Sequence, residues 1–337
     1  MNKNMKKETT STSNNWPNKV KKATRGLLPW LVSGGLVAYV VYTEDMGIVI
    51  DALGKGSSPV FFGVVIPFLV FLLFLETIFL LYGFRWFAGV GRFSDLLRAR
   101  AATYLLTVIS IFVGLGGLVI YGKKRYGLSY SMGTTIVLNE LLHELASQCT
   151  LAMLVGILLP AALIPAGTVM QVQAVTTVGM IGVGIYLFIL FISRLARYLP
   201  EGFRKKNVFN PFNDITLLQY AVFYLVKLVQ NILYGFFLAG LLYAFGIKPP
   251  IIVCIAFMQI IHLTRAIPVS AFGIGVDQIA ISFLFSSWEP ENSPGLLLAC
   301  SLVFTFTLII GRALLGVPFL KGVFDDLVKQ SHDEEPE

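Results

Sequence analysis

Charged side chains are scarce in this sequence. Asp, Glu, Lys and Arg together make up 13% of the 337 residues, whereas soluble domains carry about 25%. Hydrophobic residues make up 56%, and the mean hydropathy is +0.76. A water-soluble fold of this length needs a polar surface that so few charged residues cannot cover, while a lipid bilayer accepts apolar helix exteriors. The composition therefore argues against a soluble protein and predicts an all-α polytopic membrane protein.

Cysteine is also rare, and its spacing carries no motif. Cys149, Cys254 and Cys300 lie far apart inside apolar runs, and none has a CxxC or Cys/His neighbour. Neither a disulfide framework nor a zinc site is indicated. The sequence also lacks a nucleophile–base arrangement, a Walker-type loop and a dinucleotide fingerprint. We therefore expect no cofactor, no metal and no catalytic residue.

The net charge of +7 comes from short basic clusters between apolar runs, not from one basic face, so we expect no nucleic-acid partner. An excess of Lys and Arg marks the cytoplasmic side of a membrane. It predicts that residues 1–26 form a basic, disordered cytoplasmic tail and that the loop from Arg194 to Lys206 is cytoplasmic. The acidic tail, residues 321–337, is expected there too. The predicted location is the cytoplasmic membrane, with both termini inside.

Residues 27–320 are expected to form a single transmembrane domain. Apolar runs of about 20 residues are long enough to cross a bilayer as helices. The first run follows a polar tail and lacks a cleavage site, so we interpret it as a retained span rather than a signal peptide. The six predicted spans are 27–42, 60–84, 132–159, 174–192, 217–245 and 294–320.

Two further apolar segments are expected to enter the membrane and return. Ala101 to Tyr121 is followed by Lys123, Lys124 and Arg125, which a simple crossing would leave outside. We therefore predict a re-entrant hairpin from the cytoplasm. Glycine suits a tight tip buried against protein. The glycines predicted at this tip are Gly114, Gly116 and Gly117.

The second such segment follows Pro249. It is apolar to Ile261, is broken by polar residues and glycines, and becomes apolar again from Ile279 to Phe285. It is too broken for one helix and too short for two spans, which predicts a re-entrant hairpin from outside. Residues 27–160 and 174–320 would then form an inverted-topology repeat. The residues predicted at the second tip are Pro268, Gly273 and Gly275.

Ionisable residues inside the spans are the candidates for function, because each costs free energy in lipid. Glu140, His143, Glu144 and Gln148 have the spacing of one helical face. The face is interpreted either as lining a central cavity or as structural hydrogen bonding between helices. A di-metal carboxylate site would need a second Glu-x-x-His step, which the sequence lacks.

Further candidates come from the second half. Arg265, Asp277 and Gln278 flank the second tip, either as a binding site or as an ion pair that holds the hairpin together. Lys227 lies about ten residues inside its span, so it is expected to point inward rather than snorkel. With Arg312 in the last span, these cations are of the types that hold phosphate. We predict that one polar cavity brings together Glu140, Glu144, Lys227, Arg265 and Asp277.

Most of the chain, from about Leu27 to Leu320, resembles the transmembrane region of lysylphosphatidylglycerol synthases and their free-standing relatives. The resemblance rests on Tyr-Gly-Leu-Ser at Tyr126 leading into Val-Leu-Asn-Glu-Leu-Leu-His-Glu, which looks like the family's Glu-Arg-x-x-Asp helix. It rests also on the run from Pro268 to Ala280, similar to the family's Pro, Gly-x-Gly-Val and Arg-Glu-Ala run. The sequence departs from the family at Leu118, Val119, Leu141, Asp277 and Gln278.

The resemblance implies a flippase-like domain that binds or moves an anionic or lipid-linked substrate, with membrane lipids as partners. Synthases of the family carry a soluble aminoacyl-transferase domain after the membrane region, and here about 17 residues follow Leu320. We therefore do not expect aminoacyl transfer. The alternatives are a non-transporting scaffold or regulatory partner of an envelope-lipid enzyme, and an intramembrane lipid glycosyl- or acyltransferase. Transport predicts a polar cavity reachable from each face, whereas a scaffold predicts dry, satisfied polar pairs.

Overall fold

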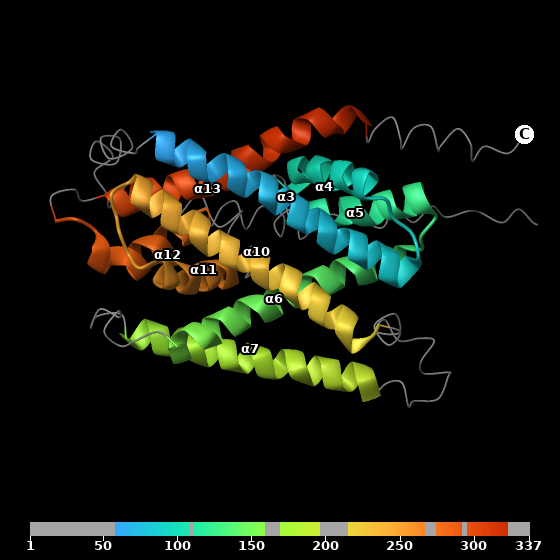
Figure 1. The fold of residues 1–337 in the computed structure, drawn as a ribbon, viewed down its shortest axis with the longest axis horizontal. Helices are drawn as coiled ribbons and strands as arrows, with labels where there is room; N and C mark the ends of the chain where they lie inside the picture. Colours follow the sequence, from blue (N-terminus) through green and yellow to red (C-terminus); the bar gives the residue numbers. More distant parts are fainter. Residues whose placement is uncertain are drawn as a thin grey trace, which may run out of the picture.

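The computed structural model describes residues 58–107, 111–158, 169–195, 215–266, 274–291 and 295–322. The described residues form helices and their connections, and none of them is in a strand (Figure 1). The predicted span 27–42, both tails, most of the loop from Arg194 to Lys206, and the tip residues Pro268 and Gly273 lie outside the described residues. The helices are α3 (Ser58–Ala88), α4 (Phe93–Thr107), α5 (Ile111–Tyr126), α6 (Tyr130–Leu158), α7 (Val169–Leu195), α10 (Leu217–Ala244), α11 (Ile251–Ala266), α12 (Val276–Phe285) and α13 (Leu296–Gly316), with short 3-10 turns at Ser286–Trp288 and Val317–Phe319.

Five of these helices are long and apolar enough to cross a membrane. Their spanning stretches are 20 to 30 residues long, and a helix of 20 residues covers about 30 Å, the thickness of the hydrocarbon core. They coincide with the five predicted spans that fall within the described residues. The all-α membrane class is therefore confirmed for this part of the chain. The stretches are Pro59–Ala88, Tyr130–Leu158, Val172–Phe191, Leu217–Ala244 and Leu296–Gly322.

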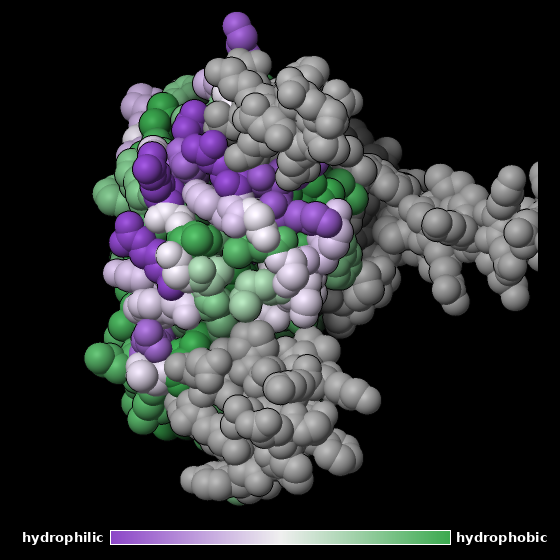
Figure 2. Space-filling view, turned by 90° about the vertical axis from the view of Figure 1, so that its right-hand side faces the viewer, coloured by the Kyte–Doolittle hydropathy of each residue, from purple (hydrophilic) through white to green (hydrophobic). Residues whose placement is uncertain are grey.

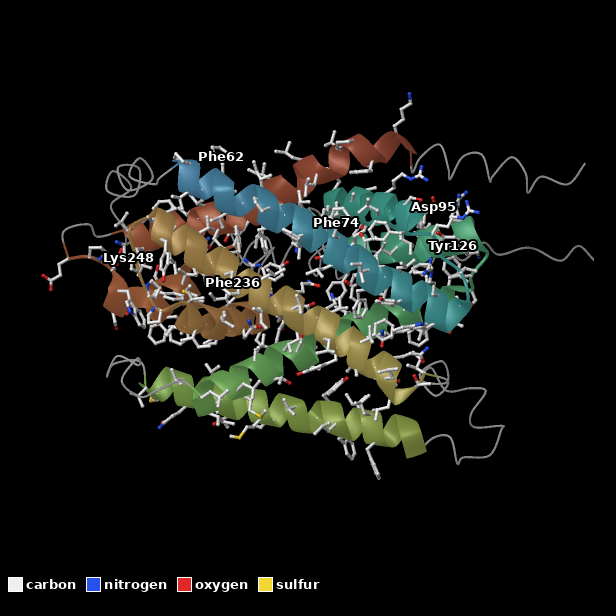
Figure 3. All side chains as sticks on the ribbon, in the orientation of Figure 1. Phe62, Phe74, Asp95, Tyr126, Phe236 and Lys248 are labelled. Carbon is white, nitrogen blue, oxygen red and sulfur yellow. The ribbon has the colours of Figure 1, made fainter. Side chains whose placement is uncertain are left out.

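The order of elements repeats along the chain. A long helix, two short helices and a second long helix occur as α3 to α6 and again as α10 to α13. The first long helices of the two sets, α3 and α10, pack side by side and run in opposite directions, as the labelled residues Phe62, Phe74, Phe236 and Lys248 show (Figure 3). The short helices of the two sets begin at opposite ends of the molecule (Figure 1).

The first pair of short helices, α4 and α5, forms a hairpin whose open end carries charge. Asp95 pairs with Arg98 at 2.7 Å and with Arg125 at 3.1 Å. Burial by itself would raise the pKa of Asp95, but hydrogen bonds and charge from the two arginines hold it below its ordinary value. Hydrophilic side chains gather at this end of the molecule (Figure 2). The start of α4 and the end of α5 therefore lie on the same side.

The glycines predicted at the hairpin tip lie elsewhere. Gly114, Gly116 and Gly117 are within α5, after the connection at residues 108–110, whose placement the structure does not describe. A Cβ atom at Gly114 would lie 2.3 Å from Thr107 Cγ2, and one at Gly117 would lie 2.7 Å from Leu106 Cδ1. These two glycines let the arms of the hairpin approach closely, which is a packing role and not a turn. The positions of glycines in a sequence do not by themselves distinguish a turn from a close contact between helices.

The second pair of short helices, α11 and α12, packs inside the other end of the bundle. Phe257 and Phe285 meet edge to face with ring centroids 5.3 Å apart. Gly275 begins α12 with a φ of 88°, a conformation that glycine adopts at no steric cost. Its backbone N–H donates to the side chain of Gln278 at 2.6 Å. Gly275 is thus the one predicted tip residue of this hairpin that the structure describes, and it lies at the turn into α12.

Candidate functional site

A polar face of α6 lies in the centre of the helix bundle. The i, i+3, i+4 spacing places Glu140, His143 and Glu144 on the side of α6 that packs against α3, α10 and α11. The side chain of Glu140 is 5% exposed and that of Glu144 is 20% exposed, so Glu144 lies nearer the edge of the cluster. His143 is fully buried. Sequence spacing alone identified this face.

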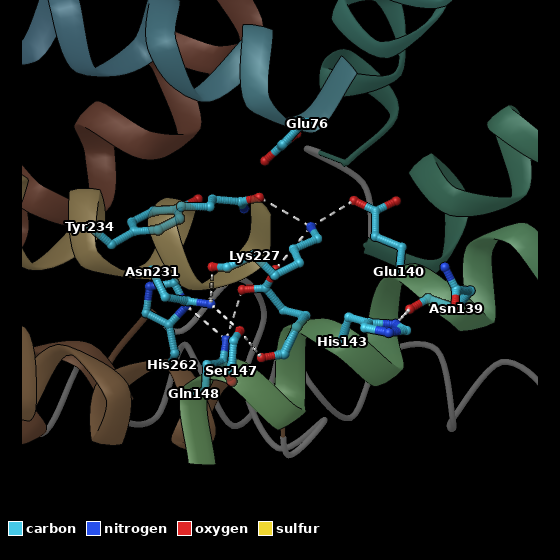
Figure 4. A network of polar contacts seen from close by, with 12 residues as sticks. Glu76, Asn139, Glu140, His143, Ser147, Gln148, Lys227, Asn231, Tyr234 and His262 are labelled. Atoms are coloured by element: carbon cyan, nitrogen blue, oxygen red, sulfur yellow. Dashed lines mark hydrogen bonds and ion pairs between the residues drawn. The ribbon is translucent and has the colours of Figure 1, made fainter. Parts of the chain in front are cut away.

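Lys227 of α10 joins the two glutamates. Its Nζ atom lies 3.1 Å from Glu140 Oε1 and 3.0 Å from Glu144 Oε2, and it donates to Gln230 Oε1 at 3.2 Å. All three ammonium hydrogens thus have an acceptor. Figure 4 shows the Lys227 side chain pointing toward Glu140 across the interface between α10 and α6. The structure therefore brings together three of the five residues that were predicted to converge.

Glu76 and Arg100 extend the cluster, and sequence reasoning gave neither of them a role in the site. Arg100 Nε lies 2.5 Å from Glu76 Oε2, and its NH2 lies 2.8 Å from Glu140 Oε1. Glu76 also accepts from Tyr104 Oη at 2.9 Å and lies 3.3 Å from Arg312. Arg100 was not predicted as a site residue because it belongs to a basic stretch that is typical of a cytoplasmic loop. The start of α4 at Phe93 places it inside the bundle.

We call these six charged side chains the ion-pair network. Three are carboxylates and three are cations, and they come from α3, α4, α6, α10 and α13. Both sets of the repeated helices contribute. The members of the ion-pair network are Glu76, Glu140, Glu144, Arg100, Lys227 and Arg312.

Arg265 and Asp277 form a separate ion pair across the second hairpin. Arg265 Nε donates to Asp277 Oδ1 at 2.8 Å, and Thr305 donates to Asp277 Oδ2 at 3.0 Å. Gln278 donates to Thr305 Oγ1 at 3.1 Å, so α12 is bound to α13 beside the pair. Within the described part of the chain, no ion pair joins Arg265 or Asp277 to Glu140, Glu144 or Lys227. Arg265 thus pairs with Asp277, and the convergence of all five residues on one polar cavity stays a prediction.

A neutral bridge runs between the two clusters. Gln148 Nε2 donates to Glu144 Oε1 at 3.0 Å and lies 3.2 Å from His262 Nδ1. His262 is one helical turn before Arg265 on α11. Both amide hydrogens of Gln148 are then in use, and His262 Nδ1 accepts one of them, which corresponds to a neutral imidazole protonated at Nε2. The bridge relates Glu144 to the second hairpin without an ion pair.

His143 has a different environment from its neighbours on α6. Its ring is surrounded by Phe79, Tyr186, Tyr220 and Phe223, with centroids 5.4 to 6.1 Å away. His143 Nδ1 lies 2.8 Å from the carbonyl oxygen of Asn139, an acceptor, so Nδ1 carries the hydrogen. His143 was predicted as a site residue, but it packs among aromatic rings. It makes no ion pair with any described residue.

Several polar atoms of the site lack a hydrogen-bond partner among the described residues. Nine buried side-chain nitrogen and oxygen atoms are in this state, whereas buried polar atoms in folded proteins are usually paired. Most belong to the ion-pair network or to side chains beside it. Such atoms give the site unused capacity to bind a polar group. They are Asn139 Nδ2 and Oδ1, Glu140 Oε2, His143 Nε2, Gln148 Oε1, Asn231 Oδ1, Gln259 Oε1, His262 Nε2 and Arg312 Nε.

Three of the charged side chains reach the edge of the buried region. Arg312 is 25% exposed, Glu144 is 20% exposed and Arg265 is 18% exposed, while Lys227 is 2% exposed. The site is therefore buried at its centre and accessible at these three positions. Among the described residues, no group of three or more His, Cys, Asp or Glu side chains is placed to hold a metal ion.

No protein family, no curated protein and no solved structure matches this chain. The resemblance to the transmembrane region of lysylphosphatidylglycerol synthases therefore stays a prediction from the sequence.

Proposed function

We propose that this protein is a lipid flippase-like transporter that binds an anionic or lipid-linked headgroup at the ion-pair network. The observation that carries the proposal is that six charged side chains from five helices meet in an otherwise apolar bundle. Charged residues inside membrane helices are costly and mark substrate or ion pathways. Stability does not explain them, because buried ion pairs often contribute no more than well-packed hydrophobic residues.

The arrangement of helices supports the same proposal. Transporters with inverted repeats hold their substrates where broken helices meet near the middle of the membrane. In this proposal the six predicted spans and the two re-entrant hairpins form such a repeat. The end of the bundle that carries Asp95, Arg98 and Arg125 faces the cytoplasm because of its basic residues. The α4–α5 hairpin enters from that side, and the α11–α12 hairpin enters from the other.

The headgroup would bind first at the accessible cations. Arg312 is the most exposed cation of the ion-pair network, and its Nε atom has no hydrogen-bond partner among the described residues. A guanidinium group matches a phosphate with two parallel hydrogen bonds. Arg265, at the edge of the neighbouring pair, is of the same kind. Phosphate-bearing headgroups are therefore the substrate class that this site fits.

Loss of one accessible cation tests the proposal. We expect the purified protein, reconstituted in vesicles, to expose inner-leaflet fluorescent phosphatidylglycerol to an impermeant quencher. Arg312→Gln should slow this movement by at least about tenfold, because it removes one charge-assisted hydrogen bond worth about 1.5–3 kcal/mol. Lys248→Gln is the matched control, because Lys248 is exposed at one end of the bundle. Equal rates for Arg312→Gln and the unchanged protein would remove the ion-pair network as the transport site.

The scaffold alternative has one observation in its favour. Every charged member of the ion-pair network has a partner of opposite charge, as a purely structural cluster requires. A scaffold or regulatory partner of an envelope-lipid enzyme would give no lipid movement in vesicles, whatever the headgroup. That result with correctly folded protein would favour the scaffold.

A further inference from the structure

The charges of the ion-pair network and of the neighbouring pair cancel. Three carboxylates face three cations in the network, and Asp277 faces Arg265 beside it. An uncompensated charge in a low-dielectric interior costs far more than a paired one. A ligand with a net negative charge would therefore unbalance the site unless a positive charge enters with it.

The carboxylates differ in how well their negative charge is compensated. Glu76 has Arg100, Arg312 and the Tyr104 hydroxyl as partners. Glu140 has two cationic partners, Arg100 and Lys227. Asp277 has Arg265 to itself through several hydrogen bonds.

Glu144 is the least compensated of the four. Among the described residues, its one cationic partner, Lys227, is shared with Glu140, and its other partner is the neutral amide of Gln148. It is also the most accessible, with 20% of its side chain exposed against 5% for Glu140, 3% for Glu76 and 0% for Asp277. A proton therefore reaches Glu144 most easily and displaces the fewest favourable contacts there.

The groups around Glu144 leave it as the proton acceptor. His262 already accepts a hydrogen from Gln148 at Nδ1, a bond that protonation would remove. The charged residues of α5 lie in its last turn. The other titratable and charged groups on the elements packed against this part of α6 are Glu140, His143 and Cys149 on α6 itself, Glu76 on α3, Tyr186 on α7, Tyr220, Tyr224, Lys227 and Tyr234 on α10, and His262 and Arg265 on α11.

We propose that the site takes up one proton, on Glu144, when it binds a ligand that carries one negative charge. The proton comes from water and binds a Glu144 carboxylate oxygen. The Lys227–Glu144 contact then breaks, and the freed N–H of Lys227 donates to an oxygen of the anionic headgroup. Lys227 stays bound to Glu140 throughout. The positive charge of the proton and the negative charge of the headgroup cancel, so the total charge of the site does not change. This inference rests on the proposed transport function and names the ion that accompanies the substrate.

Calorimetry in buffers of different ionisation enthalpy measures the protons taken up on binding. The probes are dihexanoyl-phosphatidylglycerol, which carries one negative charge, and dihexanoyl-phosphatidylcholine, which is zwitterionic. We expect uptake of about one proton with the first probe and none with the second. By linkage, affinity for the anionic probe should fall about tenfold per pH unit as the pH rises, while affinity for the zwitterionic probe stays constant.

Two variants locate the proton. Glu144→Gln keeps the shape of the side chain and should bind the anionic probe without proton uptake and without pH dependence. Glu291→Gln makes the same chemical change at an exposed position outside the site and should retain the uptake of one proton.

The outcomes separate this inference from the transport proposal. Anionic binding without proton uptake by the unchanged protein would overturn the inference, and so would proton uptake that persists in Glu144→Gln. If the protein moves lipid in vesicles but binds the anionic probe without proton uptake, the transport proposal holds and this inference does not. If the Glu144→Gln protein does not fold, the pH dependence of the unchanged protein with the two probes still decides.

Discussion

Lys227 lies about ten residues inside a spanning helix, too far from either end for its ammonium group to reach water along its own stem. That position predicts an inward side chain, and the structure places it 2% exposed between two glutamates. The partners themselves follow only from the packing of α6 on α10. The sequence of neither helix specifies how the other packs against it. The sequence therefore indicates that Lys227 needs a carboxylate but not which one.

Replacing Lys227 tests how far the carboxylates depend on it. Lys227→Met keeps an unbranched side chain, one heavy atom shorter, and leaves Glu144 without a cation among the described residues, while Glu140 retains Arg100. Removing one partner of a buried ion pair costs about 3–5 kcal/mol. We expect a loss of this order in the free energy of unfolding, measured by denaturant in mixed micelles. Adding Glu144→Gln should restore part of it.

The control for this comparison is Lys248→Met, at an exposed position where the change should stay within about 0.5 kcal/mol. A Lys227→Met protein as stable as Lys248→Met would mean that the ammonium contributes no net binding to the two glutamates.

At the scale of elements, apolar character and length identified every described helix that is long and apolar enough to cross a membrane. The positive charges after Tyr121 identified the α4–α5 pair as a hairpin segment, and Arg125 does meet Asp95 at the start of α4. The glycine positions were misassigned because glycine serves both turns and close helix contacts. Arg100 was missed because the sequence does not show that α4 lies within the bundle. Contacts between distant helices are decided by packing, which hydrophobic patterns do not specify.

Among the described helices, α7 packs mainly against α6. It lies at one side of the bundle against α6 (Figure 1), and little of its apolar stretch is buried. Small residues let the two backbones approach. A Cβ atom at Gly179 would lie 2.6 Å from both Cys149 O and Met153 N, which are backbone atoms of α6. Helices in a membrane associate through this kind of close packing.

Adding one methyl group at this contact should separate the helices. Gly179→Ala forces backbone atoms apart, and overpacking of this kind costs about 1–3 kcal/mol. We expect a lower Tm for the detergent-solubilised protein. Gly184→Ala is the matched control on the same helix, because a Cβ atom there meets nothing within 4 Å. It should leave the Tm unchanged or raise it, since alanine favours helix over glycine by about 1 kcal/mol. Equal effects of the two changes would contradict the packing of α7 on α6.

At the scale of the molecule, the repeat relates two sets of helices that run in opposite directions. The charged residues Glu140 and Glu144 come from the first set, and Lys227 and Arg312 come from the second. Neither set could balance its own charges in this arrangement, so the ion-pair network exists only where the halves meet. Relative motion of the halves would therefore change the same ion pairs that the proposed substrate would contact, as alternating access requires of a transporter.

The opposite orientation of the two hairpins predicts their accessibility in a cell. Lys124 lies in the last turn of α5, and Lys248 follows α10 at the other end of the bundle (Figure 3). With the buried native cysteines replaced by alanine, Lys124→Cys should react with an impermeant thiol reagent only after the membrane is opened, because basic residues stay in the cytoplasm. Lys248→Cys should react in intact cells. Reaction of both positions from the same side would rule out the inverted repeat, since it would place the open ends of the two hairpins on one face of the membrane.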